Sequence, residues 1–204
     1  SRCVIIKPSG GAQGKGIYLA MSPKAVKPTE DAVAQVYIAR PLLLDGYKFD
    51  LRIYALVTCC DPLRVLIYRE GLVRLCTMEY SPPAAANVNS TFMHLTNYSL
   101  NKHNPTFVEN NLEEEGDSSK RSLAWLWEWM RQRGIDPSAV WADIADVVVK
   151  TLISIQSTLA QSFRACQVSG AETKTPFTCF ELLGFDVLIT DQLRAVLIEV
   201  NHMP

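Results

Sequence analysis

The glycine-rich segment KPSGGAQGKG, at residues 7–16, leads into a strand-like run at residues 17–20. A phosphate-binding P-loop needs a glycine, four residues, Gly-Lys and then Ser or Thr, and its loop must open into a helix. Here Ser9 stands where the first glycine belongs and Gly16 where the hydroxyl residue belongs. The segment therefore predicts the tip of a β-hairpin whose first strand covers residues 3–6.

A hairpin tip of this composition has two interpretations. Glycines allow backbone N–H groups to approach phosphate oxygens closely, as the glycine-rich lid of a kinase does. Lys7 and Lys15 add positive charge to the same segment. An ordinary flexible turn explains the glycines equally well, so this segment alone does not establish nucleotide binding.

The composition is typical of a soluble globular protein, with 204 residues of which 48% are hydrophobic and 20% charged. Because the net charge is -1, we expect neither a nucleic acid nor an anionic membrane as partner. No apolar run reaches the roughly 18 to 20 residues of a membrane span. The six cysteines show no zinc spacing, and we interpret them as reduced core residues of a cytoplasmic protein.

The next part of the chain predicts an antiparallel meander. A short strand ends at Ile38, Asp45-Gly46 forms a turn, and a longer strand covers residues 49–57. Further turns are predicted at Asp61-Pro62 and Glu70-Gly71, which separate strands at residues 63–68 and 72–77. A loop at residues 81–99 follows.

Two helices are predicted after this loop. The first is capped by Ser118 or Ser119 and ends at Gly134, and the second begins at Asp136-Pro137. The apolar stripe of the second helix consists of Val140, Ile144, Val147, Thr151, Ile155 and Leu159.

The last 25 residues predict two strands joined by a turn. The order of strands, helices and strands indicates an α+β fold with a mainly antiparallel sheet. The chain starts without Met on one strand-like run and stops just after another, so we expect it to be a fragment of a longer protein.

The final hairpin contains a candidate metal site. With a turn at residues 191–194, the antiparallel register places Asp186 opposite Glu199, at a Cβ separation of about 4.5 to 5.5 Å, with Asn201 on the diagonal. Val196, Ile198 and Val200 then point into a core. Two carboxylates this close call for a positive charge, and oxygen ligands without His or thiolate suit Mg²⁺. The alternative is a solvated polar face.

The whole chain resembles the tubulin-tyrosine-ligase-like family. The resemblance lies in "GGAQGKGI", "QVYIARPLLLDGYKFDLRIYALV", "YREGLVR", "HLTNYSLNK" and "FELLGFDVLITDQLRAVLIEVN", and its wording is most similar to the glutamate-adding branch. It implies an ATP-grasp fold, in which residues 1–40 belong to the central subdomain and residues 41–204 form the C-terminal subdomain. ATP would lie between the glycine-rich hairpin lid and a central sheet.

The resemblance also assigns roles to residues. It implies that nucleotide is bound by Lys7, Gln13, Gly14, Lys15, Gly16, Ile17, Gln35, Val36, Tyr37, Ile38, Lys48, Phe49, Asp50, Thr96 and Asn97. Arg74, Tyr98, Ser99 and Lys120 would recognise the incoming glutamate, Arg52 would line the same cleft, and His202 would lie near the protein acceptor. Asp186, Glu199 and Asn201 match the Mg²⁺ ligands that the hairpin register predicts.

The implied reaction joins free L-glutamate to a glutamate side chain of tubulin, through an acylphosphate formed with ATP and Mg²⁺. The implied enzyme is a monomer on microtubules, with the cilium or basal body as a more specific location. Two alternatives remain: a glycine ligase of the same family, which would not need Arg74, and an inactive tubulin-binding pseudoenzyme. A protein kinase is disfavoured because neither a His-Arg-Asp nor an Asp-Phe-Gly motif is present.

Overall fold

The computed structural model describes the chain except for residues 1–2, 11–13, 27–30, 110–114, 167–178 and 203. The chain forms two compact units, each built from separate stretches of sequence. The proposed subdomain boundary at residue 40 lies inside unit 1. Unit 1 contains Ser1–Asp50, Val73–Arg121 and Ile189–Leu193, and unit 2 contains Leu51–Leu72, Ser122–Leu188 and Arg194–Pro204.

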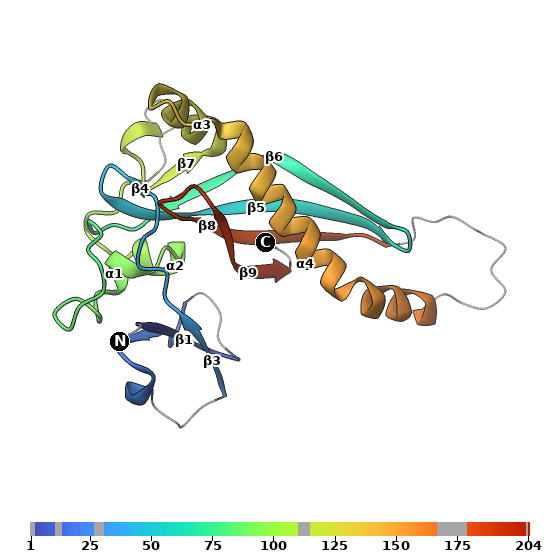
Figure 1. Ribbon diagram of the computed structural model, residues 1–204, viewed down its shortest axis with the longest axis horizontal. Helices are drawn as coiled ribbons and strands as arrows, with labels where there is room; N and C mark the ends of the chain where they lie inside the picture. Colours follow the sequence, from blue (N-terminus) through green and yellow to red (C-terminus); the bar gives the residue numbers. More distant parts are fainter. Residues whose placement is uncertain (1–2, 11–13, 27–30, 110–114, 167–178, 203) are drawn as a thin grey trace. The chain divides into compact units, whose positions relative to one another are not determined.

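Unit 1 contains a three-stranded antiparallel sheet of order β2-β1-β3 (Figure 1). The central strand β1 (Val4–Pro8) pairs with β2 (Tyr18–Ala20) on one side and with β3 (Ala32–Val36) on the other. The predicted hairpin around the glycine-rich segment is therefore confirmed, although its first strand continues to Pro8.

Both faces of this sheet are packed, because alternate residues of β1 point to opposite sides. Val4 and Ile6 form one core cluster with Ala20. Ile5 lies on the other face, where it packs against a cluster of Leu19, Tyr37 and Leu95. Tyr37 of this second cluster is itself a predicted nucleotide contact, and Leu95 directly precedes another, Thr96.

Short elements make up the rest of unit 1. β4 (Leu43–Leu44) pairs with the start of β5 around the predicted turn, in which Asp45 and Gly46 have φ angles of 51° and 89°. Two positive φ angles are the requirement of a tight hairpin turn, so this prediction is confirmed. The loop predicted at residues 81–99 is partly helical. The other short elements are η1 (Pro23–Ala25), α1 (Thr91–His94), α2 (Tyr98–Asn101), η2 (Glu115–Asp117) and β7 (Lys120–Ser122).

The larger sheet has the strand order β7-β6-β5-β8-β9. Its long hairpin consists of β5 (Tyr47–Cys60) and β6 (Leu63–Leu75), and its C-terminal strands are β8 (Glu181–Ile189) and β9 (Ala195–His202). β5 and β8 pair antiparallel, from Leu51 opposite Val187 to Val57 opposite Glu181. The mixed α+β fold with antiparallel sheets is thus confirmed.

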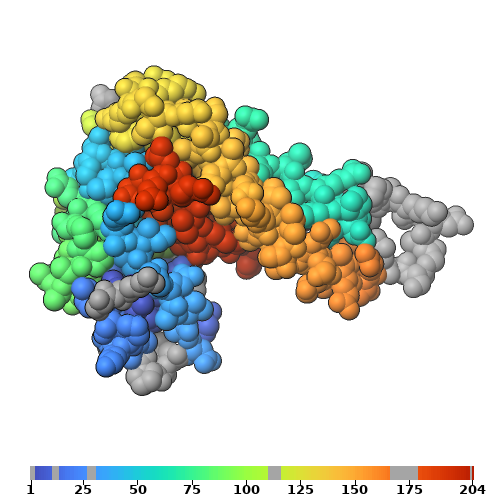
Figure 2. Space-filling model, viewed as in Figure 1, coloured from blue at the N-terminus to red at the C-terminus, as the bar shows by residue number. Residues whose placement is uncertain are grey.

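Helix α4 (Pro137–Cys166) lies across the strands of unit 2 (Figure 1). In the space-filling view its side chains form a continuous ridge, with the C-terminal hairpin beside its first half (Figure 2). The Gln156 amide donates to the carbonyl of Cys60 at 3.4 Å. The apolar residues buried in this unit include Leu51, Ile53, Ala55, Val57, Phe185 and Val187 of the strands and Val140, Ile144, Val148 and Leu152 of the helix.

The turn predicted at Glu70-Gly71 is wrong, because β6 runs without interruption from Leu63 to Leu75. Gly71 lies inside the strand, where an added Cβ would come within 2.4 Å of the Arg52 carbonyl oxygen. The glycine therefore permits a close approach of two backbones rather than a change of direction.

The predicted cap of the first helix is also wrong. Residues 120–122 form β7, and α3 (Leu123–Gln132) is capped by Ser122, whose Oγ accepts from the backbone N–H of Trp125 at 3.1 Å. The predicted end is confirmed: Gly134 has a φ of 72°, and the N–H of Ile135 reaches the carbonyl of Met130 as in a Schellman motif.

The apolar stripe of α4 differs from the predicted one after Ile144. Val148 and Leu152 are buried, whereas Val147 and Thr151 are half-buried and Ile155 is exposed. The buried residues follow steps of four, and such a row is inclined to the helix axis. The prediction followed a row that turns away from the sheet. No helix among the described residues is long and apolar enough to span a membrane.

The prediction that Val196, Ile198 and Val200 of β9 point into a core is wrong for Val200. Val200 is 40% exposed, and Val196 and Ile198 are only half-buried. β9 is the last strand in the sheet order, so it has a paired neighbour on one side. An edge strand offers less burial to its side chains than β8, which is buried from Gly184 to Ile189.

Candidate functional site

A buried carboxylate lies at the centre of the candidate site in unit 1. Asp50, on β5, is 2% exposed and accepts hydrogen bonds from Nε and Nη2 of Arg74 at 2.8 and 2.6 Å. Thr96 Oγ1 donates to the same carboxylate at 2.7 Å. We call Asp50, Arg74 and Thr96 the Asp50 cluster. It joins a predicted glutamate-binding arginine to two predicted nucleotide contacts.

The Asp50 cluster orients Arg74 rather than simply neutralising it. A guanidinium has five N–H donors in a rigid fork, and Asp50 engages one edge of that fork. The side chain of Arg74 is 10% exposed. The cluster thus fixes the orientation of the Arg74 guanidinium in a nearly water-free setting.

Lys120 and Tyr98 lie in the electrostatic neighbourhood of this arginine. The Nζ of Lys120, on β7, is 3.4 Å from the centroid of the Tyr98 ring. Burial lowers the pKa of Lys120; Glu109 acts in the opposite direction, and the charge of Arg74 lowers the pKa further. Three of the four predicted glutamate-binding residues are therefore brought together, and the fourth, Ser99, is half-buried on α2 next to Tyr98.

Lys48 is the second buried cation of unit 1. Its Nζ donates to the Tyr37 hydroxyl at 3.0 Å and to the His94 carbonyl at 2.7 Å. Burial lowers the pKa of Lys48, Cys76 and Asp50 raise it, and the charge of Lys7 lowers it again. Lys7 and Lys48, both predicted nucleotide contacts, thus lie close enough for their charges to interact.

The glycine-rich hairpin approaches another predicted nucleotide contact. Gly14 has a φ of 76°, and an added Cβ would lie 2.9 Å from the Asn97 side-chain oxygen. Only glycine satisfies both conditions without strain. Lys15 and Gly16 are exposed and Ile17 is half-buried, whereas Gln13 lies outside the described residues.

The predicted hinge along the adenine is the end of β3 and the two residues after it. Gln35 and Val36 are exposed on β3, Tyr37 is buried and Ile38 is half-buried. β3 is the outer strand of the three-stranded sheet, so one of its backbone edges is not paired within that sheet. Such an edge suits hydrogen bonding to a base. Phe49 is 1% exposed and has a packing role.

A second buried carboxylate lies in unit 2. Arg52 and Asp186 stand opposite each other in the register of β5 and β8, and Asp186 is 1% exposed. Arg52 donates from Nε to Oδ1 at 2.6 Å and from Nη2 to Oδ2 at 3.2 Å. The positive charge that we expected beside Asp186 is therefore supplied by Arg52, and charge balance alone does not demand a metal.

The candidate metal ligands lie on the C-terminal hairpin. Asn201 Nδ2 lies 3.5 Å from the Gly184 carbonyl, so these two residues, which the predicted register places opposite each other, are close in space. A carboxylate has about four lone pairs, of which Arg52 engages two. Within the described part of the chain no three His, Cys, Asp or Glu side chains form a metal cluster. Carboxylate and amide oxygens are the ligand type that Mg²⁺ prefers, and joint binding of the ion by Asp186, Glu199 and Asn201 stays a prediction.

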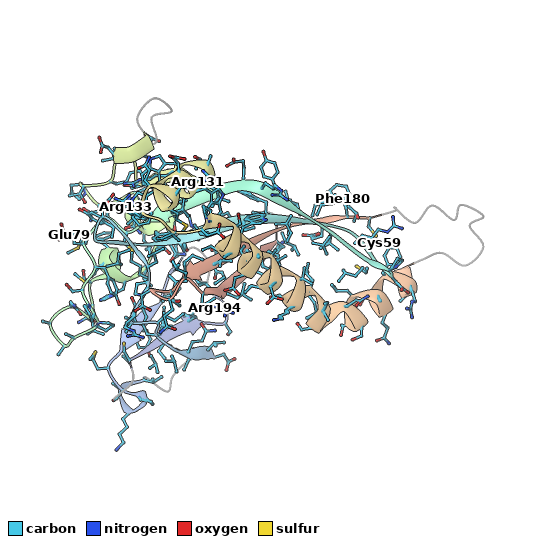
Figure 3. The ribbon with its side chains drawn as sticks, turned by 45° about the horizontal axis from the view of Figure 1, so that its top comes forward. Cys59, Glu79, Arg131, Arg133, Phe180 and Arg194 are labelled. Carbon is cyan, nitrogen blue, oxygen red and sulfur yellow. The ribbon has the colours of Figure 1, made fainter. Side chains whose placement is uncertain are left out.

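The strand that carries Glu199 and Asn201 is anchored at its start. Asp143 of α4 accepts from Arg194 at 2.9 and 3.0 Å and from the backbone N–H of Ala195 at 2.7 Å. The Ala195 hydrogen bond is the main cause of the lowered pKa of Asp143, which Arg194 lowers further. Arg194, labelled in Figure 3, directly precedes β9 and so ties the start of this strand to α4. His202, at the other end of β9, is exposed.

Sequence reasoning missed the partners of the predicted residues. Nothing in the sequence predicts that Arg52 meets Asp186, because the two strands are separated by more than a hundred residues. His94 belongs to the quoted HLTNYSLNK segment and received no role, although it is 1% exposed. A buried histidine beside a lysine is visible only once the fold is known.

The chain is similar to known proteins over its whole length. The model of the tubulin-tyrosine ligase family matches residues 1–204. The chain is 45% identical to tubulin polyglutamylase TTLL13 of Mus musculus, with 100% of the chain and 25% of that protein covered. It is 46% identical to tubulin polyglutamylase ttll6 of Danio rerio and 44% identical to tubulin polyglutamylase TTLL7 of Xenopus tropicalis, each over 98% of the chain and over 25% and 22% of those proteins. The chain thus spans about a quarter of the length of the curated relatives it matches.

Proposed function

The chain belongs to the tubulin-tyrosine ligase family, and from this premise we propose that it is part of an ATP-dependent ligase that adds glutamate to tubulin. The observation that carries the proposal is the oriented guanidinium of Arg74 in the Asp50 cluster with the half-buried ammonium of Lys120 beside it, two donors suited to an amino-acid carboxylate. The relatives named tubulin polyglutamylase support the choice of glutamate and tubulin.

The proposed reaction has two steps. A carboxylate oxygen of the tubulin acceptor attacks the γ-phosphorus of ATP, ADP leaves, and an acylphosphate forms. The amine of free glutamate then attacks the acyl carbon, phosphate leaves, and the nitrogen loses a proton to give an amide. Such a reaction depends on positioning and electrostatic stabilisation and needs no covalent enzyme nucleophile.

Three groups of residues serve the nucleotide in this proposal. Lys7 and Lys48 offset phosphate charge, and the glycine-rich hairpin acts as the lid of an ATP-grasp fold. Bound Mg²⁺ would be held by Asp186, Glu199 and Asn201 and would stabilise negative charge on the phosphates. The nucleotide set is completed by Gln13, Gly14, Lys15, Gly16, Ile17, Gln35, Val36, Tyr37, Ile38, Asp50, Thr96 and Asn97, with Arg52 beside Asp186.

Incoming glutamate is assigned to Arg74, Lys120, Tyr98 and Ser99. Arg74 suits a carboxylate because a guanidinium forms two parallel hydrogen bonds, which an ammonium does not. His202 is assigned to the side of the protein acceptor. The proposed setting is the microtubule cytoskeleton, including that of cilia.

The test compares amino acids in a full-length protein that contains this chain. Tubulin, ATP and labelled glutamate or glycine are incubated with the wild type, with Arg74→Ala and with Arg69→Ala. Arg69 is an exposed arginine of the same strand and serves as the matched control. We expect glutamate incorporation that falls about 10- to 100-fold in Arg74→Ala, the effect of losing a charge-assisted hydrogen bond.

Two results would count against the assignment. Preferred incorporation of glycine would favour the glycine ligase, for which Arg74 has no carboxylate side chain to bind. Microtubule binding without incorporation of either amino acid would favour a pseudoenzyme.

A further inference from the structure

Two groups of His94 are linked to Lys48 by hydrogen bonds, one directly and one through Tyr37. Its backbone carbonyl accepts directly from Lys48 Nζ at 2.7 Å. Its ring Nδ1 lies 3.0 Å from the Tyr37 hydroxyl, which itself accepts from Lys48 Nζ at 3.0 Å. One residue thus reaches one amine through both its backbone and its side chain.

The hydrogen bonds have a definite direction. The Lys48 ammonium only donates, so Tyr37 accepts through its oxygen and retains a single O–H to donate. His94 Nδ1 lies within hydrogen-bond distance of that hydroxyl, and a neutral ring with its proton on Nε2 accepts there. Two of the three donors of Lys48 are occupied by Tyr37 and His94, and the third defines the direction in which Lys48 interacts with a ligand.

The surroundings keep the ring neutral and fixed. His94 is 1% exposed, and the rings of Tyr37 and Tyr80 contact it edge-on at centroid distances of 5.6 and 5.9 Å. Burial lowers the pKa of His94, the charge of Lys48 lowers it further, and the backbone of Asn87 acts in the opposite direction. A neutral imidazole is the form that accepts at Nδ1.

The titratable groups around Lys48 are Tyr37, His94, Cys76, Asp50 and Lys7. Burial raises the pKa of Cys76 to about 12, so this thiol stays neutral. Burial also raises the pKa of Tyr37, so this hydroxyl remains a donor. Asp50 carries the hydrogen bonds of Arg74 and Thr96, which leaves Tyr37 and His94 as the groups that hold the Lys48 amine.

We propose that His94 is a positioning residue, which acts through its carbonyl and through Tyr37 to aim the third N–H of Lys48 at a nucleotide phosphate. This inference rests on the proposed function for the role of Lys48. His94 and the Tyr37 hydroxyl together form what we call the Lys48 relay. In this proposal the hydroxyl of Tyr37 holds Lys48, whereas its backbone contacts the base.

The experiment measures binding of a non-hydrolysable ATP analogue to the full-length protein by titration calorimetry. The variants are His94→Leu, His94→Asn and Tyr37→Phe. His103→Asn is the matched control, because His103 is exposed and directly follows the HLTNYSLNK segment. Asn places an acceptor near the position of Nδ1, whereas Leu has none. Thermal denaturation of each variant identifies any that fail to fold, in which case Tyr37→Phe, which preserves shape, carries the test.

We expect the affinity to fall about 10-fold in Tyr37→Phe, which loses a charge-assisted hydrogen bond to Lys48, and about 2- to 10-fold in His94→Leu, which loses the neutral bond to Tyr37. Most of the second loss should be recovered in His94→Asn. Loss of the Tyr37 oxygen removes a partner of the charged amine, so the pKa of Lys48 falls further and the alkaline loss of affinity moves to lower pH. If Tyr37 and His94 served only in packing, the pH at which affinity is lost on the alkaline side would not change.

The inference is overturned if His94→Asn and His94→Leu bind the analogue equally, or if the alkaline limb is the same in Tyr37→Phe as in the wild type. The proposed function fails separately, when the wild type itself does not bind the analogue. If the wild type binds the analogue and all relay variants bind it equally well, the positioning role of His94 is contradicted and the proposed function is not.

Discussion

Arg52 and Asp186 form a two-point ion pair between neighbouring strands, with nitrogen–oxygen distances of 2.6 and 3.2 Å. The side chains of Arg52 and Asp186 are 16% and 2% exposed. The pair neutralises the carboxylate that is also the first candidate metal ligand. It therefore has consequences for stability as well as for the site.

Replacing Arg52 by Ala should strongly destabilise the protein, because it leaves a buried carboxylate without its partner. We expect a loss of about 3–5 kcal/mol in the free energy of unfolding, measured by chemical denaturation of the full-length protein. Arg164→Ala is the control: Arg164 also pairs with an aspartate, Asp61, but their side chains are 65% and 45% exposed. That change should cost less than about 1 kcal/mol. Equal costs for the two variants would contradict the role given to burial.

Arg74→Lys should separate charge from geometry in the Asp50 cluster. Lysine keeps the positive charge but cannot reproduce the paired hydrogen bonds to Asp50. We expect kcat/KM for glutamate to fall about 10-fold or more in steady-state assays, with a smaller change in KM for ATP. Wild-type kinetics toward glutamate in Arg74→Lys would show that the paired N–H groups of the Arg74 guanidinium are not needed to bind glutamate.

Asp143→Asn should remove a pH-dependent contribution to stability. The pKa of Asp143 is lowered by the Ala195 hydrogen bond and by Arg194. A depressed carboxyl pKa contributes stability above the unfolded value of about 3.9, and this contribution is lost as the pH falls through the folded pKa. In denaturation curves the variant should be less stable than the wild type at neutral pH, with a difference that shrinks on acidification. A difference independent of pH would exclude the carboxylate as its cause.

Gly71→Ala tests the close contact of β5 and β6. The added methyl group would meet the Arg52 carbonyl oxygen at 2.4 Å, which requires the strands to move apart. We expect destabilisation by about 1–3 kcal/mol, the usual cost of overpacking. Gly10→Ala is the matched control, since no atom of the described residues beyond its chain neighbours lies within 4 Å of its added Cβ, and it should stay within about 0.5 kcal/mol of the wild type.

Local signals in the sequence were sufficient for much of the fold. The Asp45-Gly46 turn, the glycine hairpin and the end of α3 at Gly134 follow from residues that need positive φ angles or that interrupt apolar runs. Gly71 shows the limit of such signals. A glycine placed for a close approach cannot be told from a turn glycine until the neighbouring strand is known.

The sequence proposes the candidate site as a list of residues, and it does not predict how they are arranged. The register of the last hairpin was derived from one short turn, and the contact between Asn201 and Gly184 is consistent with it. The contacts of Arg52 with Asp186 and of Arg74 with Asp50 depend on how distant segments meet. The charge argument therefore anticipated a cation beside Asp186 but not that an arginine supplies it.

The most direct test of the proposed function is mass spectrometry of tubulin incubated with the full-length protein, ATP and glutamate. The proposal predicts tubulin peptides that gain one or more glutamate residues through side-chain amide bonds, and no gain when ATP is omitted. Peptides that gain glycine, that gain only phosphate, or that remain unchanged beside an active reference ligase would contradict it.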